Sequence, residues 1–96
     1  MQTVIRRYRG EGAPGFIDEL GRRRGEVEQL IQSVPGFSAY YLVRTADGGF
    51  SITVCQNRSG IEESTRRAAE WVRANMGDKA MAPEVIEGEG VFRFSA

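Results

Sequence analysis

The 96-residue sequence contains no histidine and only one cysteine, Cys55. Without histidine, the chain has no imidazole to act as a general base, to ligate haem iron or to complete most kinds of zinc site. A single cysteine cannot form an intrachain disulfide or a thiolate cluster, and the carboxylates do not converge in a ligand-like spacing. We therefore predict no metal site and no cofactor.

An excess of charge of one sign is absent too, as are long apolar runs. Thirteen basic and thirteen acidic residues cancel, which argues against binding to nucleic acid or an anionic membrane through long-range charge. No apolar run approaches the roughly 20 residues that span a bilayer. Residues 1–10 contain three arginines and lack the apolar core of a secretory signal. We predict a soluble cytoplasmic protein with no nucleic-acid or membrane partner.

The most informative segment is a predicted β-hairpin. Two runs, residues 37–45 and 50–57, flank a turn whose Asp-Gly and Gly-Gly steps supply the positive φ angles of tight turns. A first strand is predicted at residues 3–9, where β-branched residues begin the run, and a last strand at residues 84–94.

Two other segments show apolar residues at helical spacing. The first begins near Pro14, which suits the first turn of a helix, and ends at Pro35. Gly21 and Gly25 lie inside it and indicate a kink or a close packing contact. The second begins at Ser59, which fits the N-cap position of a capping box.

The resulting order is β-α-β-β-α-β, the ferredoxin-like arrangement of the α+β class, in a single domain of residues 1–96. Right-handed crossovers place both helices on one face of a four-stranded antiparallel sheet, with the first strand central.

Alternation along the hairpin predicts two different faces. One is apolar: Phe37, Ala39, Tyr41, Val43, Phe50, Ile52 and Val54. The other is small or polar: Ser38, Tyr40, Leu42, Arg44, Ser51, Thr53, Cys55 and Asn57. We expect the apolar face to lie under the helices.

In the predicted first and last strands, the helix-covered face is expected to include Ile5, Ile86 and Phe92. The uncovered face would then carry Arg6, paired with Glu87 on the neighbouring strand. Because Tyr8, Tyr40, Leu42 and Val85 would also lie there, this face is too apolar to stay in water. A second subunit covering it would form a two-fold homodimer.

Two motifs are weak. Residues 10–15 match G-x-G-x-x-G, but the chain is too short for a doubly wound dinucleotide fold, so a plain loop is expected. The run Arg22-Arg23-Arg24 is interpreted as a solvated helix face.

Three residues have both a structural and a functional interpretation. Trp71 lies on the flank of the second helix and either packs at an edge or forms a pocket wall. Asn57 either caps the second helix or donates a hydrogen bond to a ligand. Tyr40 either packs in a dimer interface or presents its hydroxyl to a pocket. Cys55 is expected to be an unreactive small residue.

Several stretches resemble the dimeric α/β-barrel superfamily, and within it the antibiotic-biosynthesis-monooxygenase-like branch. They are Val34-Pro35-Gly36-Phe37, the Asp-Gly-Gly hairpin, residues 51–57, residues 59–63 and Ala68-Ala69-Glu70-Trp71-Val72. Active members of this branch oxidise aromatic polyketides without a cofactor or degrade haem, using Asn and Trp with Tyr or His. The chain lacks that histidine and has no asparagine in its first strand, which argues against haem degradation.

The resemblance implies a cofactor-independent monooxygenase acting on an aromatic small molecule. Asn57, Trp71 and Tyr40 would be its catalytic residues. The pocket would lie on the uncovered sheet face, inside the barrel that the dimer encloses, and would be lined by Arg6, Tyr8, Thr53 and Cys55. A non-catalytic ligand-binding or structural dimer is the alternative left open.

Overall fold

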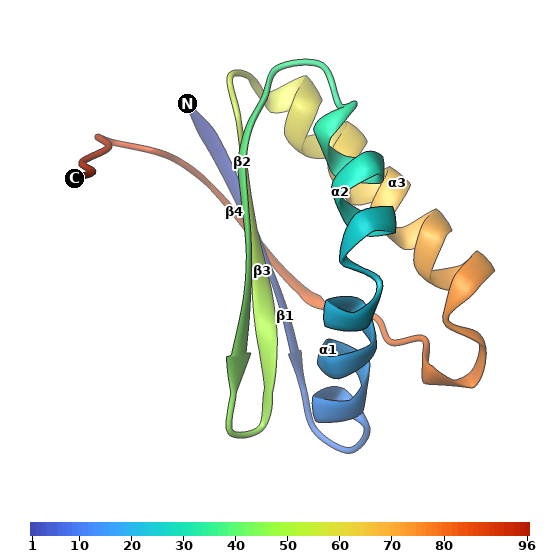
Figure 1. Cartoon of the computed structure of the whole chain (residues 1–96). Helices are drawn as coiled ribbons and strands as arrows, with labels where there is room; N and C mark the ends of the chain where they lie inside the picture. The colour runs from blue at the N-terminus through green and yellow to red at the C-terminus, as the bar shows by residue number, and fades with distance from the viewer.

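The computed structural model describes residues 1–96 as a sheet with one layer of helices against it (Figure 1). The sheet has the strand order β2-β3-β1-β4, and all neighbours are antiparallel. Its strands are β1 (Gln2–Arg9), β2 (Phe37–Thr45), β3 (Gly48–Cys55) and β4 (Glu84–Glu89). The predicted ferredoxin-like arrangement with a central first strand is confirmed.

Three α-helices cover one face of the sheet, where two were expected (Figure 1). They are α1 (Ala13–Arg22), α2 (Arg24–Gln32) and α3 (Arg58–Asn75), followed by a short 3₁₀ turn, η1 (Gly77–Lys79). The predicted first helix is interrupted at Arg23, whose φ of −102° and ψ of 32° are not helical. Gly21 and Gly25 lie on either side of this interruption, and a Cβ atom on either would contact nothing within 4 Å. Of their two expected roles, a kink fits and a close packing contact does not. No helix is long and apolar enough to cross a membrane.

The N-cap of α3 is Asn57, and the prediction of Ser59 is wrong. The Oδ1 atom of Asn57 accepts a hydrogen bond from the Gly60 N–H at 3.1 Å and another from the Ser59 hydroxyl at 2.7 Å. An asparagine oxygen at this position satisfies one of the free N–H groups of the first turn.

The last strand is shorter than predicted. Hydrogen-bonded pairing with β1 ends at Glu89, and the chain from residue 91 onward runs out beyond the sheet (Figure 1). Phe92 is 79% exposed and does not face the helices.

The two faces of the sheet are the reverse of those predicted, except at Phe37, which packs against both buried apolar clusters as expected. Val4, Arg6 and Tyr8 of β1 are buried under the helices. The small and polar side chains of the hairpin lie beside them: Ser51, Thr53 and Cys55 are buried, and Tyr40 and Leu42 pack against the main apolar cluster.

The helices come so close to the sheet that small sheet residues are needed beneath them. A Cβ atom on Gly49 would lie 2.9 Å from Cγ1 of Ile17 in α1. One on Gly60 in α3 would lie 3.0 Å from Cβ of Cys55 and 2.9 Å from the Pro35 carbonyl oxygen. The large apolar side chains of this layer come from the helices instead: Phe16, Ile17, Ile31, Ile61 and Val72.

The uncovered face is consequently the apolar one. In register, Ile5 lies between Ile52 and Ile86, and Ile52 lies beside Tyr41, so one apolar row crosses all four strands. Tyr41 is 54% exposed and Ile86 is 52% exposed. An apolar face of this extent on a monomer indicates a contact surface.

Candidate functional site

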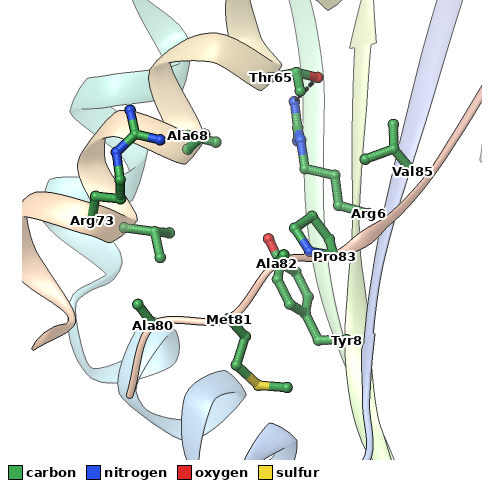
Figure 2. A pocket seen from close by; sticks show the side chains of 12 residues that line it. Arg6, Tyr8, Thr65, Ala68, Arg73, Ala80, Met81, Ala82, Pro83 and Val85 are labelled. Atoms are coloured by element: carbon green, nitrogen blue, oxygen red, sulfur yellow. Dashed lines mark hydrogen bonds between the residues drawn. The ribbon is translucent and has the colours of Figure 1, made fainter. Parts of the chain in front are cut away.

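A cavity of about 330 Å³ lies between the sheet, α3 and the segment that joins α3 to β4 (Figure 2). Its lining is mainly apolar, and its side chains come from three parts of the chain: Arg6, Tyr8 and Val85 from the sheet; Thr65, Ala68, Ala69, Val72 and Arg73 from α3; and Ala80, Met81, Ala82 and Pro83 from the connecting segment. A volume of this size is at the lower end of those that hold small organic ligands.

A second, smaller cavity of about 30 Å³ lies deeper under the helices. Arg6, Tyr8, Ala68 and Val72 line both cavities, so the two share a wall. The smaller one is also lined by Tyr40 and Trp71, and its volume is close to that of one water molecule. Four of the predicted site residues therefore meet here: Arg6, Tyr8, Tyr40 and Trp71.

Arg6 is the most unusual of these residues because it is only 2% exposed and has no carboxylate partner. Its Nη1 donates a hydrogen bond to the Thr53 hydroxyl at 3.0 Å. Its Nη2 donates to the hydroxyls of Ser64 at 2.7 Å and Thr65 at 3.1 Å. Its Nε has no partner. Burial lowers the pKa of Arg6 because the cation has lost its hydration.

The predicted pair of Arg6 with Glu87 is wrong. Arg6 lies opposite Val85 in the register of β1 and β4, and Glu87 lies opposite Val4. The nearest cation to Glu87 is Arg58, whose Nη2 is 3.8 Å from the carboxylate. Glu87 lies two residues further along β4 than Val85. Its effect is the smallest of those that raise the pKa of Arg6.

Two buried tyrosines stand beside the guanidinium. Burial raises the pKa of Tyr8 to about 12, against an opposing effect of Arg6. Burial also raises the pKa of Tyr40, which Ser51 and Arg6 oppose. Both phenols are therefore neutral near pH 7 and can donate hydrogen bonds, but they are poor bases. The Tyr8 ring also packs on Phe16, with ring centroids 4.5 Å apart.

Trp71 both packs against the core and forms a pocket wall, the two roles predicted for it. Its ring is half-buried against the main apolar cluster and forms part of the wall of the smaller cavity. The guanidinium of Arg23, at the break between α1 and α2, lies 5.8 Å from the ring centroid. This cation–π contact ties the indole to the helix break.

The remaining predicted residues are placed differently. Thr53 contacts the site only through its hydrogen bond to Arg6. Cys55 is fully buried with Val4, Val34 and Ile61 under the start of α3, and burial raises the pKa of its thiol. Asn57 caps α3. Neither Cys55 nor Asn57 lines either cavity.

Sequence reasoning missed the contribution of α3 to Arg6. Ser64 is fully buried, and its hydroxyl donates to the Ile61 carbonyl at 2.8 Å while accepting from Arg6. The next residue, Thr65, also turns its hydroxyl to the guanidinium and accepts a hydrogen bond from it. A Ser-Thr pair on the buried side of a helix is the one signal that points to such a partner.

The cavity linings contain no acidic side chain and no thiol. No group of three or more histidine, cysteine, aspartate or glutamate side chains could hold a metal ion. The donor set around the cavities also does not fit haem, because it offers no imidazole or thiolate for the iron. What the arrangement can do is bind an apolar molecule and stabilise negative charge on it.

Comparison with solved structures shows the fold. SnoaB, a cofactor-independent oxygenase from Streptomyces nogalater, is 16% identical, covering 99% of this chain and 97% of its own, with a TM-score of 0.67. The chain shares the ferredoxin-like fold of this protein, as the sequence predicts. At this level of identity the likeness shows the fold alone.

Two further structures show that activities differ within this fold. NE2512 from Nitrosomonas europaea, a protein of unknown function, is 13% identical over 99% of this chain and 92% of its own, with a TM-score of 0.69. The haem-degrading protein Rv3592 from Mycobacterium tuberculosis is 20% identical over 99% and 100%, with a TM-score of 0.63. No protein-family model and no curated protein sequence matches the chain. Activity must therefore be argued from the site.

Proposed function

We propose that this protein is a cofactor-independent monooxygenase that acts on an aromatic small molecule bound between the sheet and α3. The observation that carries the proposal is a buried arginine, Arg6, among the residues that line an apolar cavity. The fold likeness to a cofactor-independent oxygenase supports it.

The chemistry requires an electron-rich substrate. An anthrone-type CH₂ group is a carbon acid that ionises to an enolate by losing a proton to water, and the enolate can transfer electrons directly to O₂. One oxygen atom enters the ring as a carbonyl, and the other leaves as water together with the two hydrogens of the CH₂ group. The substrate supplies all the electrons, and Arg6 would stabilise the enolate oxygen, as preorganised donors do.

The other residues would position the substrate. Tyr8 and Tyr40 are neutral donors beside Arg6, and Trp71 offers an aromatic wall. The predicted catalytic role of Asn57 finds no support in its position at the cap of α3. A cytoplasmic location and the lack of a cofactor stay predictions.

We also propose a homodimer, formed through the apolar open face of the sheet. The row of Tyr41, Ile52, Ile5 and Ile86 supports it, as do the exposed Val91, Phe92 and Phe94 of the C-terminal segment. Because this face is opposite the cavities, a dimer would leave the candidate site between the sheet and the helices of each subunit.

Oxygen uptake with anthrone and related hydroxyanthracenes tests the enzyme. We expect O₂ consumption by the wild-type protein in the presence of a metal chelator, and its loss in Arg6→Gln. An absence of uptake across the panel would favour the alternative of a non-catalytic ligand-binding dimer.

A further inference from the structure

The charge of Arg6 is not balanced inside the protein. Its three hydrogen-bond partners are neutral hydroxyls, its Nε has none, and it takes part in no ion pair. By contrast, arginines on the helix surfaces pair with carboxylates, as in Arg66 with Glu63 at 2.6 Å. Burying a cation without a counterion is strongly unfavourable, so an anion beside it would be stabilised.

The cavity that Arg6 lines has room for such an anion and nothing that repels it. No carboxylate lines either cavity, and Arg73, the other cation of the larger one, is exposed at its rim. The rest of the lining is mainly Ala, Val, Met and Pro, which would contact an apolar ring.

The site also lacks a group that could remove a proton from the ligand. The chain has no histidine, and burial raises the pKa of both Tyr8 and Tyr40. Cys55 does not reach the cavities. A ligand that becomes anionic here must therefore be acidic enough to ionise in the field of the guanidinium alone.

We propose that the cavity selects an aromatic acid in its anionic form, a carboxylate or a phenolate, with the oxyanion held against Arg6. The phenolate is the form that an ionised anthrone-type substrate takes, so it deepens the proposed oxygenase, whereas a carboxylate held against Arg6 would leave the enolate oxygen without its donor. The inference rests on the proposed function only for the identity of the site. Opposite charge at contact distance lowers the pKa of an acid by about 1 to 3 units. Binding of the anion should therefore exceed that of a neutral analogue by about 10-fold or more.

Calorimetry with 1-naphthoate and its neutral amide, 1-naphthamide, tests the carboxylate form. We expect the Kd of naphthoate to be lower by about 10-fold or more, with this preference lost in Arg6→Gln and largely kept in Arg6→Lys. Arg73→Gln is the matched control, because it removes the same charge from the exposed rim. In this variant the ratio of the naphthamide Kd to the naphthoate Kd should differ from the wild-type ratio by about 2-fold at most.

Absorbance titration of bound 4-nitrophenol tests the phenolate form. We expect its apparent pKa to fall by about 1 unit or more on the wild-type protein and on Arg73→Gln, but not on Arg6→Gln. A preference for naphthoate alone assigns the carboxylate, and a nitrophenol shift alone assigns the phenolate.

The wild-type protein alone can overturn the proposal. It would do so if naphthoate bound no more tightly than naphthamide and the apparent pKa of bound nitrophenol did not fall. A charge preference that disappears in Arg73→Gln and survives in Arg6→Gln would overturn it too. Neither measurement involves O₂, so anion selectivity without oxygen uptake would favour the non-catalytic ligand-binding dimer and leave the anion site standing.

Discussion

Replacing Arg6 with methionine should leave the protein as stable as before, or make it more stable, although the change removes three hydrogen bonds. Methionine has a similar length and no charge.

The loss is limited to the hydroxyl partners. Ser64 still donates to the Ile61 carbonyl, so its own hydrogen is satisfied. The hydroxyls of Thr53 and Thr65 lose their donor, and an orphaned buried polar group costs about 1–3 kcal/mol. Thr65 is only half-buried, so water can replace part of its bond. The total loss is about 2–4 kcal/mol.

The gain comes from removing an uncompensated charge. Keeping a guanidinium 2% exposed without a counterion costs several kcal/mol, and burying a methionine side chain contributes about 1.5–3 kcal/mol. Arg6 already buries its own methylene stem, so most of the methionine contribution cancels and the two sides nearly balance. We expect the free energy of unfolding of Arg6→Met to lie between its wild-type value and about 2 kcal/mol above it. For a domain of this size each kcal/mol shifts Tm by about 4–8 °C.

Urea unfolding followed by circular dichroism, at one fixed protein concentration, measures the difference. Ile61→Ala is the reference for a structural core residue, with an expected loss of about 2–5 kcal/mol. If Arg6→Met lost as much as Ile61→Ala, Arg6 would be a structural tie and the ligand-site argument would fail. A stable variant that no longer binds 1-naphthoate is the trade-off expected of a functional residue.

Three further changes test other parts of the structure. Ile52→Arg, in the middle of the apolar row, should convert a dimer into a monomer in light scattering; an unchanged mass would contradict the proposed sheet-to-sheet contact. Gly60→Ala should lower the free energy of unfolding by about 1–3 kcal/mol, because its methyl group would meet Cys55 and the Pro35 carbonyl oxygen; unchanged stability would show that α3 can move away. Asn57→Ala should cost about 1 kcal/mol through the lost cap while oxygen uptake per folded molecule is kept; loss of uptake at retained stability would restore the catalytic role predicted from the sequence.

Part of the candidate site could be predicted from the sequence. The family resemblance and the positions on the strands and α3 point to four residues that line the cavities: Arg6, Tyr8, Tyr40 and Trp71. Asn57 was placed near the site by residue type alone, and the same amide oxygen serves as well in a helix cap. A side chain that suits two local roles cannot be assigned until the backbone around it is known.

The wall of the larger cavity could not be predicted. Residues 80–83 contain no recognisable motif, yet they close the cavity against α3 and β1 (Figure 2). Their role depends on where η1 directs the chain, which no local pattern encodes.

The sequence by itself determined the order of elements, the topology, the hairpin and its pairing, and the weak point in the first helical segment. These features follow from local turn chemistry, from periodicity and from the handedness of crossovers. Alternation also showed that the two sheet faces differ. Only the tertiary structure decided which face lies under the helices, because that depends on how closely α1 and α3 approach. With the large apolar side chains supplied by the helices, the sheet needs Gly49, Ser51, Thr53 and Cys55 beneath them, and its apolar row is left on the outside.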